Sequence, residues 1–218
     1  KEGYAMHMPS PNTVAPAQGL YQPDEFKDNC GFGLIAHMQG DASHDLVKTA
    51  MHSLSCMTHR GGIAADGKTG DGCGLLLAMP KKFFREEAKK LSDITLSEIF
   101  AVGTVFLNLD PAIAAHSKQV LAKEIESEGL TVLAWRVIPT NNDALGEIAM
   151  QSLPAFEQII VNCPMGVTEV EFNRKLFLAR RRAEQQLSND PSFYVTTLCS
   201  TVISYKGLMM PEAIADFY

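Results

Sequence analysis

Hydrophobic and polar positions divide the chain into an irregular leader and a longer, patterned remainder. Residues 1–29 hold four prolines, few strong apolar positions and no period, a composition that does not build a core. After residue 29, short apolar runs alternate with segments whose apolar residues recur every three or four positions. We therefore predict a domain boundary between Asn29 and Cys30.

The remainder predicts a mixture of strands and helices. Several strands follow one another with no helix between them, and the last two are expected to pair with each other, so the sheet is not purely parallel. We predict a layered α+β fold, with Ser43, Asp110 and Thr168 as helix N-caps. Strands are expected at 31–38, 74–79, 98–109, 130–139, 155–163, 193–198 and 201–205, and helices at 43–58, 81–91, 110–127 and 168–187.

Composition narrows the class of protein. The 218 residues are enough for one sizeable domain or two small ones, and the formal net charge of −6 argues against nucleic acid or an anionic membrane surface as the main partner. No apolar run approaches the length of a membrane span, and the leader has no apolar signal core. The five cysteines form no C-x-x-C pair, so a disulfide framework is not expected and a reducing, cytoplasmic compartment fits best.

Cys30 is the candidate nucleophile. It opens a glycine-spaced apolar run directly after the leader. If the chain is cut before it, its own α-amine, with an ordinary pKa of about 8, can act as the base for the thiol. Gly31 and Gly33 leave room for a substrate carbonyl beside the sulfur. The alternative is a small buried cysteine at the start of a strand.

A glycine-rich loop at 59–74 follows the first predicted helix. Arg60 either caps that helix as a cation or lies near an amino-acid substrate or the catalytic cysteine. Asp66 and Asp71 each precede a glycine, which favours turn chemistry. No histidine or cysteine spacing matches a metal site, so no metal is expected. The arginine run at 180–182 favours a solvated helix face over a partner contact.

Taken together, the motifs resemble one family. Cys-Gly-Phe-Gly at 30–33, His-Arg-Gly at 59–61 and the glycine loop at 66–74 resemble, in this order, the start of the glutaminase domain of glutamate synthase large subunits. The segments 134–139, 145–147, 175–182 and 205–209 continue the resemblance, which covers residues 28–218.

The resemblance implies a fold and an activity. The fold would be the N-terminal-nucleophile αββα four-layer sandwich, and the activity that of a class II glutamine amidotransferase whose leader, residues 1–29, is removed. Cys30 would attack L-glutamine and release ammonia and then glutamate through a thioester, with Gly31 and Arg60 near the site. In the full enzyme, ammonia would pass to 2-oxoglutarate.

The resemblance also implies further partners. FMN, an iron–sulfur cluster and NADPH or ferredoxin would belong to other domains of the large subunit, with a small reductase subunit as a further partner in the full enzyme; no cofactor is expected in this chain. The Asn-Gly pair that supplies the oxyanion hole in this family is absent from the sequence. Residues 30–218 are therefore expected to be the first part of the domain, and the fragment to have little activity. The alternatives are a non-catalytic interaction module of the same fold and another class II amidotransferase.

Overall fold

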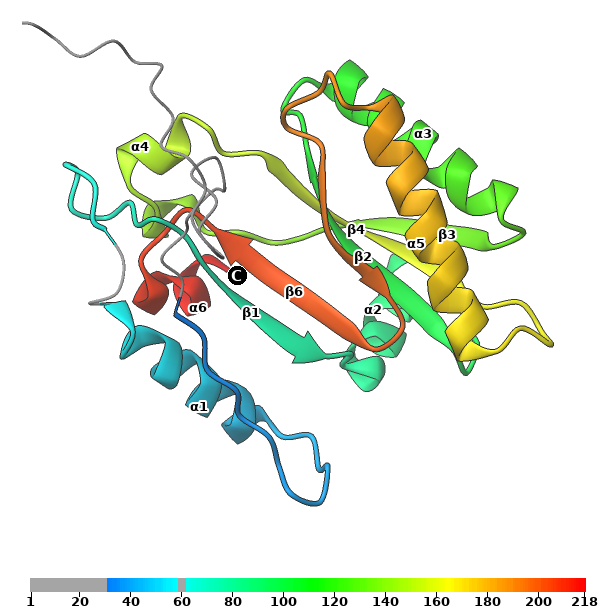
Figure 1. The fold of residues 1–218 in the computed structure, drawn as a ribbon, viewed down its shortest axis with the longest axis horizontal. Coiled ribbons are helices and arrows are strands. Elements are labelled where there is room, and N and C mark those ends of the chain that lie inside the picture. Colours follow the sequence, from blue (N-terminus) through cyan, green and yellow to red (C-terminus); the bar gives the residue numbers. More distant parts are fainter. Residues whose placement is uncertain (1–30, 59–61) are drawn as a thin grey trace, which may run out of the picture. The chain divides into compact units, whose positions relative to one another are not determined.

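The structure, a computed structural model, describes residues 31–58 and 62–218 (Figure 1). The leader with Cys30, and Arg60 in the segment 59–61, lie outside the described residues. The described residues belong to one compact unit, Gly31–Tyr218.

Helices and strands follow the sequence pattern closely. Every predicted helix, and every predicted strand except the first, is present to within three residues at each end. The helices are α1 His44–Ser55, α2 Lys81–Ser92, α3 Pro111–Ser127, α4 Glu147–Met150, α5 Glu169–Gln186 and α6 Ile214–Phe217, with 3₁₀ turns η2 Asn142–Ala144 and η3 Pro211–Ala213. The strands are β1 Cys73–Ala78, β2 Phe100–Leu107, β3 Thr131–Val137, β4 Ala155–Asn162, β5 Tyr194–Cys199 and β6 Val202–Gly207.

The predicted N-caps begin their helices as expected. The Ser43 hydroxyl accepts the Leu46 N–H, the Asp110 carboxylate accepts two amides of the first turn of α3, and the Thr168 hydroxyl accepts the Glu171 N–H. These bonds satisfy amide groups that have no partner within the helix. All three capping predictions are confirmed.

The strands form two antiparallel sheets. One has the order β3-β4-β2-β5, and the other pairs β1 with β6. The prediction that the sheet is not purely parallel is therefore confirmed. The predicted pairing of the last two strands is wrong, because β5 pairs with β2 while β6 pairs with β1. The short connection at Ser200–Thr201 carries the chain from one sheet to the other.

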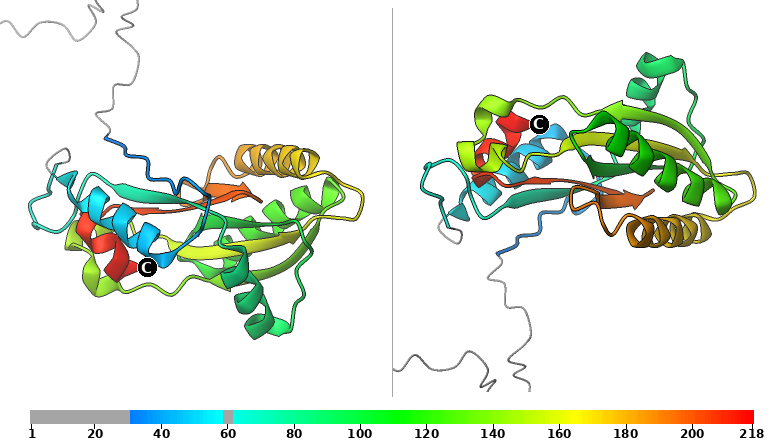
Figure 2. Two further views of the ribbon diagram at one scale, coloured as in Figure 1. Left: turned by 90° about the horizontal axis from the view of Figure 1, so that it is seen from below. Right: turned by 90° about the horizontal axis from the view of Figure 1, so that it is seen from above.

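The larger apolar core lies between the four-stranded sheet and two helices. Figures 1 and 2 show α3 and α5 side by side, and both contribute to this core. Val105 and Ile159 from the sheet, and Leu121, Phe172 and Leu176 from the helices, are fully buried in it. The arginines at 180–182 form ion pairs with glutamates of α5 and of the end of α3, which accords with the interpretation of a solvated helix face.

The opposite face of the four-stranded sheet packs against α2 and the second sheet. Phe84 of α2, Phe100 and Val102 of β2, Ile160 of β4 and Ile203 of β6 share this second core. A third core, around Phe156, Met209 and Phe217, packs against α1 through Leu54. The two sheets are thus layered face to face, with α3 and α5 on the outer side of the larger one.

The predicted strand at 31–38 is wrong. Residues 31–36 have no regular secondary structure, and Phe32, Leu34 and Met38 are almost fully exposed. A strand needs a neighbour for its backbone hydrogen bonds, and in the described part of the chain β1 pairs only with β6. The segment therefore has the apolar pattern of a strand but belongs to neither sheet of the described part of the chain.

Candidate functional site

The structure describes only one of the three predicted site residues. Cys30 and Arg60 lie outside the described residues, and Gly31 is the first described residue and is exposed. After the segment that carries Arg60, the structure describes the glycine loop from Gly62 onward and the elements that hold it.

The glycine loop is a closed, hairpin-like turn. Ile63 and Gly70 form an antiparallel bridge, and the Ala64 N–H donates to the Thr69 carbonyl at 2.8 Å. Gly67, at the tip, has a φ of +70°, a left-handed conformation that costs glycine little. The loop then leads through Gly72 into β1.

Asp66 joins the loop to a segment about eighty residues away. Its Oδ1 accepts the amides of Lys68 and Thr69, which is the turn chemistry that the sequence predicts. Its Oδ2 accepts the Thr69 hydroxyl at 2.6 Å and the Ile148 N–H of α4 at 3.0 Å. The Thr69 oxygen in turn accepts the Ala149 N–H. Asp66 and Thr69 together cap the first turn of α4.

These contacts favour the ionised form of Asp66. The Thr69 hydroxyl, the Thr69 amide and the Ile148 amide hold the pKa of the Asp66 carboxyl well below its ordinary value, because each donates to the carboxylate. Gly146 completes the junction, since a Cβ there would lie 2.3 Å from Asp66 Oδ2. The loop and α4 therefore meet through a fixed carboxylate rather than through apolar packing.

Asp71 closes the base of the loop. Its Oδ2 accepts the Gly62 N–H at 2.6 Å, nine residues earlier in the chain. The entry and exit of the loop are thereby tied together beside the bridge of Ile63 and Gly70. This is a longer-range contact than the local turn chemistry expected of Asp71.

The loop also approaches the end of β6 very closely. A Cβ on Gly70 would lie 2.7 Å from the Met209 carbonyl oxygen, and one on Gly74 would lie 2.8 Å from the Tyr205 carbonyl oxygen. Only glycine fits at such distances without a shift of the backbone. The glycines therefore hold the loop and the start of β1 against the segment 205–210.

The described cysteines differ in their suitability as nucleophiles. Burial, and secondarily the Glu212 carboxylate, raise the pKa of the Cys73 thiol to about 11. Burial also raises the pKa of the Cys163 thiol, with Glu169 and Glu171 adding to the shift. The thiolate is the reactive form, so neither group is activated. Cys56 caps the end of α1 and is exposed, and Cys199 accepts the Val202 N–H in the turn before β6.

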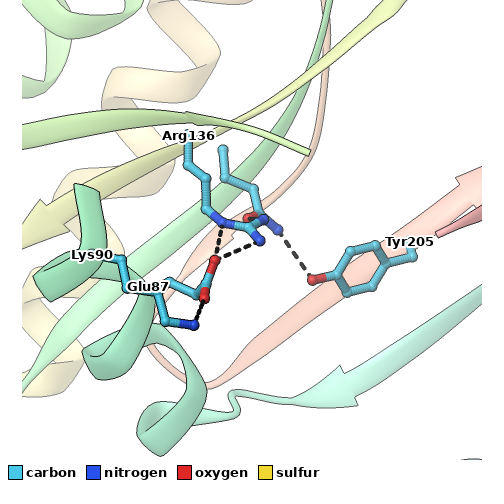
Figure 3. A network of polar contacts seen from close by, with 5 residues as sticks. Glu87, Lys90, Arg136 and Tyr205 are labelled. Carbon is cyan, nitrogen blue, oxygen red and sulfur yellow. Dashed lines mark hydrogen bonds and ion pairs between the residues drawn. The ribbon is translucent and has the colours of Figure 1, made fainter. Parts of the chain in front are cut away.

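A polar network crosses the layer between the sheets and α2 (Figure 3). The Arg136 guanidinium of β3 donates through Nε and Nη2 to Glu87 Oε2 of α2, at 3.0 and 2.8 Å. Its Nη1 donates to Gln158 Oε1 at 3.0 Å, and Gln158 Nε2 donates to the Tyr205 hydroxyl at 3.1 Å. Lys90 donates to the other oxygen of Glu87.

The network links four elements through groups that, apart from exposed Lys90, have little contact with solvent. Gln158 is fully buried, and the side chains of Arg136 and Glu87 are 13% and 17% exposed. The ammonium of Lys90 and the guanidinium of Arg136 lower the pKa of Glu87, whereas burial raises that of Tyr205. Buried polar groups need such partners, because unpaired ones cost about 1–3 kcal/mol. The network therefore fixes the spacing of the sheets and has no group suited to nucleophilic chemistry.

Metal-ligating side chains do not gather in the described part of the chain. Among residues 31–58 and 62–218, no three or more histidines, cysteines and carboxylates gather where they could hold a metal. The described cysteines lie on separate elements, so they do not provide the grouped thiolates of an iron–sulfur cluster. Within the same residues, no helix is both long and apolar enough to cross a membrane.

Comparison with known proteins places the chain in a family. It belongs to the class II glutamine amidotransferases, whose family model matches residues 30–218. The predicted α+β fold of the N-terminal-nucleophile type is thus confirmed, and the described residues supply one helical layer and both sheet layers of it.

Individual relatives are glutamate synthases. The chain is 37% identical over 209 residues to the glutamate synthase [NADPH] large chain of Bacillus subtilis, covering 95% of this chain and 14% of that protein. It is 36% identical over 198 residues to ferredoxin-dependent glutamate synthase 2 of Synechocystis, covering 89% and 12%. It is 34% identical over 224 residues to glutamate synthase [NADH] of Saccharomyces cerevisiae, covering 98% and 10%.

These matches define what kind of domain the chain is. It is a class II glutamine amidotransferase domain that matches glutamate synthase large chains, and the predicted resemblance is confirmed. The chain spans about an eighth of the length of these relatives.

Sequence reasoning missed the contacts that hold the loop. The attachment of Asp66 to α4 and the closure of the loop by Asp71 join residues that are distant in the chain. A signal was present in the composition, since an acidic residue within a glycine-rich loop is a good acceptor for backbone amides. The partner amide, however, could not be read from local spacing.

Proposed function

We propose that this chain is the glutaminase domain of a glutamate synthase and that Cys30 is its nucleophile. The observation that carries the proposal is the family match, which begins at Cys30 and leaves residues 1–29 outside it. The leader would be removed as a propeptide, so that the α-amine of Cys30 becomes free. An N-terminal amine is positioned to take the thiol proton without a second side chain.

The reaction would proceed in two steps. The Cys30 thiolate forms a bond to the side-chain carbonyl carbon of L-glutamine, the C–N bond breaks, and ammonia leaves with a proton returned by the α-amine. Water then attacks the thioester, releases glutamate and restores the thiol. Arg60 would lie near the substrate or the thiolate, where its charge attracts either. Gly31 would leave space for the substrate beside the sulfur.

The pKa values and surroundings of the other described cysteines support the assignment of Cys30 as the nucleophile. The raised pKa values of Cys73 and Cys163 keep both as neutral thiols near pH 7. Cys56 and Cys199 lie at the end of a helix and in a tight turn, without an activating base beside them in the contacts described. Cys30 remains the cysteine whose position in the chain supplies its own base once the leader is removed.

The role of the domain in a whole enzyme is part of the proposal. Ammonia would be passed to 2-oxoglutarate at a flavin site in another domain, with FMN and an iron–sulfur cluster held there and a small reductase subunit as a further partner. The relatives' names include NADPH, ferredoxin and NADH, and one of these would supply electrons to the whole enzyme. A cytoplasmic location and a role in nitrogen assimilation would accompany this activity.

The test measures both the removal of the leader and the hydrolysis of glutamine. In the full polypeptide in which this sequence occurs, we expect the mature N-terminus to be Cys30 by intact mass, and glutamine hydrolysis to be abolished by Cys30→Ala. Cys56→Ser is the matched control, since Cys56 is exposed, and it should hydrolyse glutamine like the wild type. An intact leader together with full turnover in Cys30→Ala would refute the assignment. An intact leader and no turnover in the wild type would favour a non-catalytic module. The 218 residues alone are expected to have little activity.

A further inference from the structure

We propose that Asp71 and Gly72 form a site of spontaneous isoaspartate formation, and that the hydrogen bond from the Gly62 N–H limits its rate. This modification is independent of the proposed function. The glycine loop contains two Asp-Gly pairs, at 66–67 and 71–72. The structure holds the two pairs very differently, so they should differ in how fast they react.

Isoaspartate forms at an Asp-Gly pair without any co-reactant other than water. The backbone nitrogen of the glycine forms a bond to the side-chain carboxyl carbon, and the hydroxyl of the carboxylic acid takes the proton of that nitrogen and leaves as water. Water then opens the resulting succinimide ring. Attack at the former main-chain carbonyl gives isoaspartate, and attack at the side-chain carbonyl restores aspartate. Glycine favours the ring because no side chain obstructs its nitrogen.

The pair of Asp66 and Gly67 is protected at both reacting groups. The Asp66 carboxylate accepts two amides of its own turn, the Thr69 hydroxyl and the Ile148 amide. These bonds lower the pKa of Asp66 and so disfavour the acid form that loses its hydroxyl. The Gly67 N–H, whose nitrogen would attack, donates to the Ala64 carbonyl at 3.0 Å. Ring closure here requires several bonds to open together, and such openings are rare in a folded unit.

Among the described residues, one hydrogen bond holds the pair of Asp71 and Gly72. Both residues are exposed, and the Asp71 carboxylate accepts the Gly62 N–H at 2.6 Å. Within residues 31–58 and 62–218, the Gly72 N–H makes no hydrogen bond. Opening the bond to Gly62 therefore releases the carboxyl group next to a nitrogen that no described acceptor holds.

The modification lengthens the chain where the loop enters β1. Isoaspartate adds one carbon atom to the main chain two residues before Cys73, the first residue of β1, which pairs with Gly207 of β6. A Cβ on Gly70 or on Gly74 would lie less than 3 Å from backbone atoms of the segment 205–210, so this junction has no spare room. The added carbon must therefore displace either the loop or the start of β1.

The experiment ages the full polypeptide near neutral pH in water enriched in heavy oxygen, which marks each ring opening. Trypsin cleaves after Lys68 and so places the two Asp-Gly pairs in separate peptides. Heavy oxygen in each peptide, and isoaspartate located by electron-transfer dissociation, give the two rates side by side. We expect Asp71 to react at least about ten-fold faster than Asp66 in the folded protein, since each additional hydrogen bond that must open contributes a factor of about five. In concentrated urea the two rates should be similar.

Two variants test the site and the bond that limits it. A Cβ on Gly62 would lie 2.9 Å from Asp71 Oδ1, and the Gly62 backbone is not in the left-handed region, so Gly62→Ala displaces the carboxylate without backbone strain. This change should raise the rate at Asp71 about five-fold. Asp71→Glu, whose longer side chain closes a less favoured ring, should abolish labelling of its peptide. An unchanged rate at Asp66 in the same molecules shows that each variant is folded.

Each outcome bears on the proposal. Equal rates at the two pairs in the folded protein, or a faster reaction at Asp66, would overturn it. So would an Asp71 that reacts in urea but not in the folded protein. An unchanged Asp71 rate in Gly62→Ala, with Asp66 still protected, refutes the limiting role of the bond. Label that persists in the same peptide of Asp71→Glu shows that the modified residue is a different one.

Discussion

The core beneath α3 and α5 and the glycine loop at 62–74 are held together by different forces. In the core, Val105, Phe172 and Leu176 are inaccessible to water, and their contacts are apolar and non-directional. In the loop, many residues are exposed, and carboxylates accept the backbone N–H groups that close the loop and join it to α4. The stability of the core thus depends on the apolar surface that it buries. The conformation of the loop depends on the geometry of a few hydrogen bonds.

Because of this difference, we expect the core to determine the stability of the whole unit and the loop contacts to determine the position of one segment. Removing apolar volume from the core should lower the free energy of unfolding of the whole unit, since interiors are close-packed. Removing a carboxylate from the loop should release a local segment while the rest of the unit stays folded. Substitutions in the two regions should therefore differ in whether they destabilise the whole unit or release one segment.

The largest effect is expected in the core. Phe172→Ala should lower the free energy of unfolding by about 3–5 kcal/mol, because the ring is fully buried and its removal leaves a cavity. Urea unfolding followed by circular dichroism measures the loss. Phe177→Ala, on the same helix but 57% exposed, is the control and should change little. Equal losses in both variants would contradict the placement of the core.

An intermediate effect is expected in the polar network between the sheets. Arg136→Met should cost about 1.5–3 kcal/mol of unfolding free energy, since it removes charge-assisted bonds to Glu87 and a bond to buried Gln158. Arg174→Met, at an exposed position of α5, is the matched control. Combining Arg136→Met with Glu87→Gln should cost less than the sum of the two single changes. Simple additivity would mean that the two side chains do not interact.

A local effect is expected at Asp66. Asp66→Asn should speed amide hydrogen exchange at 66–69 and 147–149 while leaving exchange in the strands of the larger sheet unchanged. The pKa of Asp66 is lowered from 3.8, so its contribution is present at neutral pH and is lost as the pH falls below about 4. The same segments should therefore exchange faster in the wild type in acid, after correction for intrinsic rates. Faster exchange throughout the unit at neutral pH would argue that the loop is not a separate element.

The smallest effect concerns reactivity rather than stability. Alkylation of Cys73 by iodoacetamide should rise with pH through a midpoint of about 11, because its thiol is partly buried near Glu212. Exposed Cys56 should react readily near pH 8. Peptide mass mapping at several pH values measures both in one sample. Equal rates at the two cysteines near pH 8 would be at odds with the described surroundings of Cys73.

The elements that the sequence predicts are those whose signals are local. The three-residue and four-residue periods located α3 and α5, and Asp110 and Thr168 marked where they begin. The α4 helix is only four residues long, and its first turn is capped by Asp66 and Thr69 from a distant loop. No local pattern could show that cap.

Strand pairing also could not be predicted from the local sequence pattern. The segment at 31–38 has the apolar composition of a strand, but strand formation depends on a neighbour elsewhere in the chain. The last two strands, β5 and β6, are close in sequence yet join different sheets. The candidate site was predicted through resemblance, and its residues Cys30 and Arg60 lie outside the described part. The sequence marked Asp71 as a turn residue, and only the structure shows that its carboxylate accepts the Gly62 N–H.

The most direct test of the central claim is covalent labelling of the full polypeptide with a glutamine-like chloroketone, followed by mass mapping of the N-terminus and all five cysteines. We expect a single label on Cys30 in a chain that begins at Cys30, with excess glutamine protecting it. A label placed on another cysteine, or glutamine hydrolysis that survives with Cys30 unlabelled and the leader still attached, would contradict it.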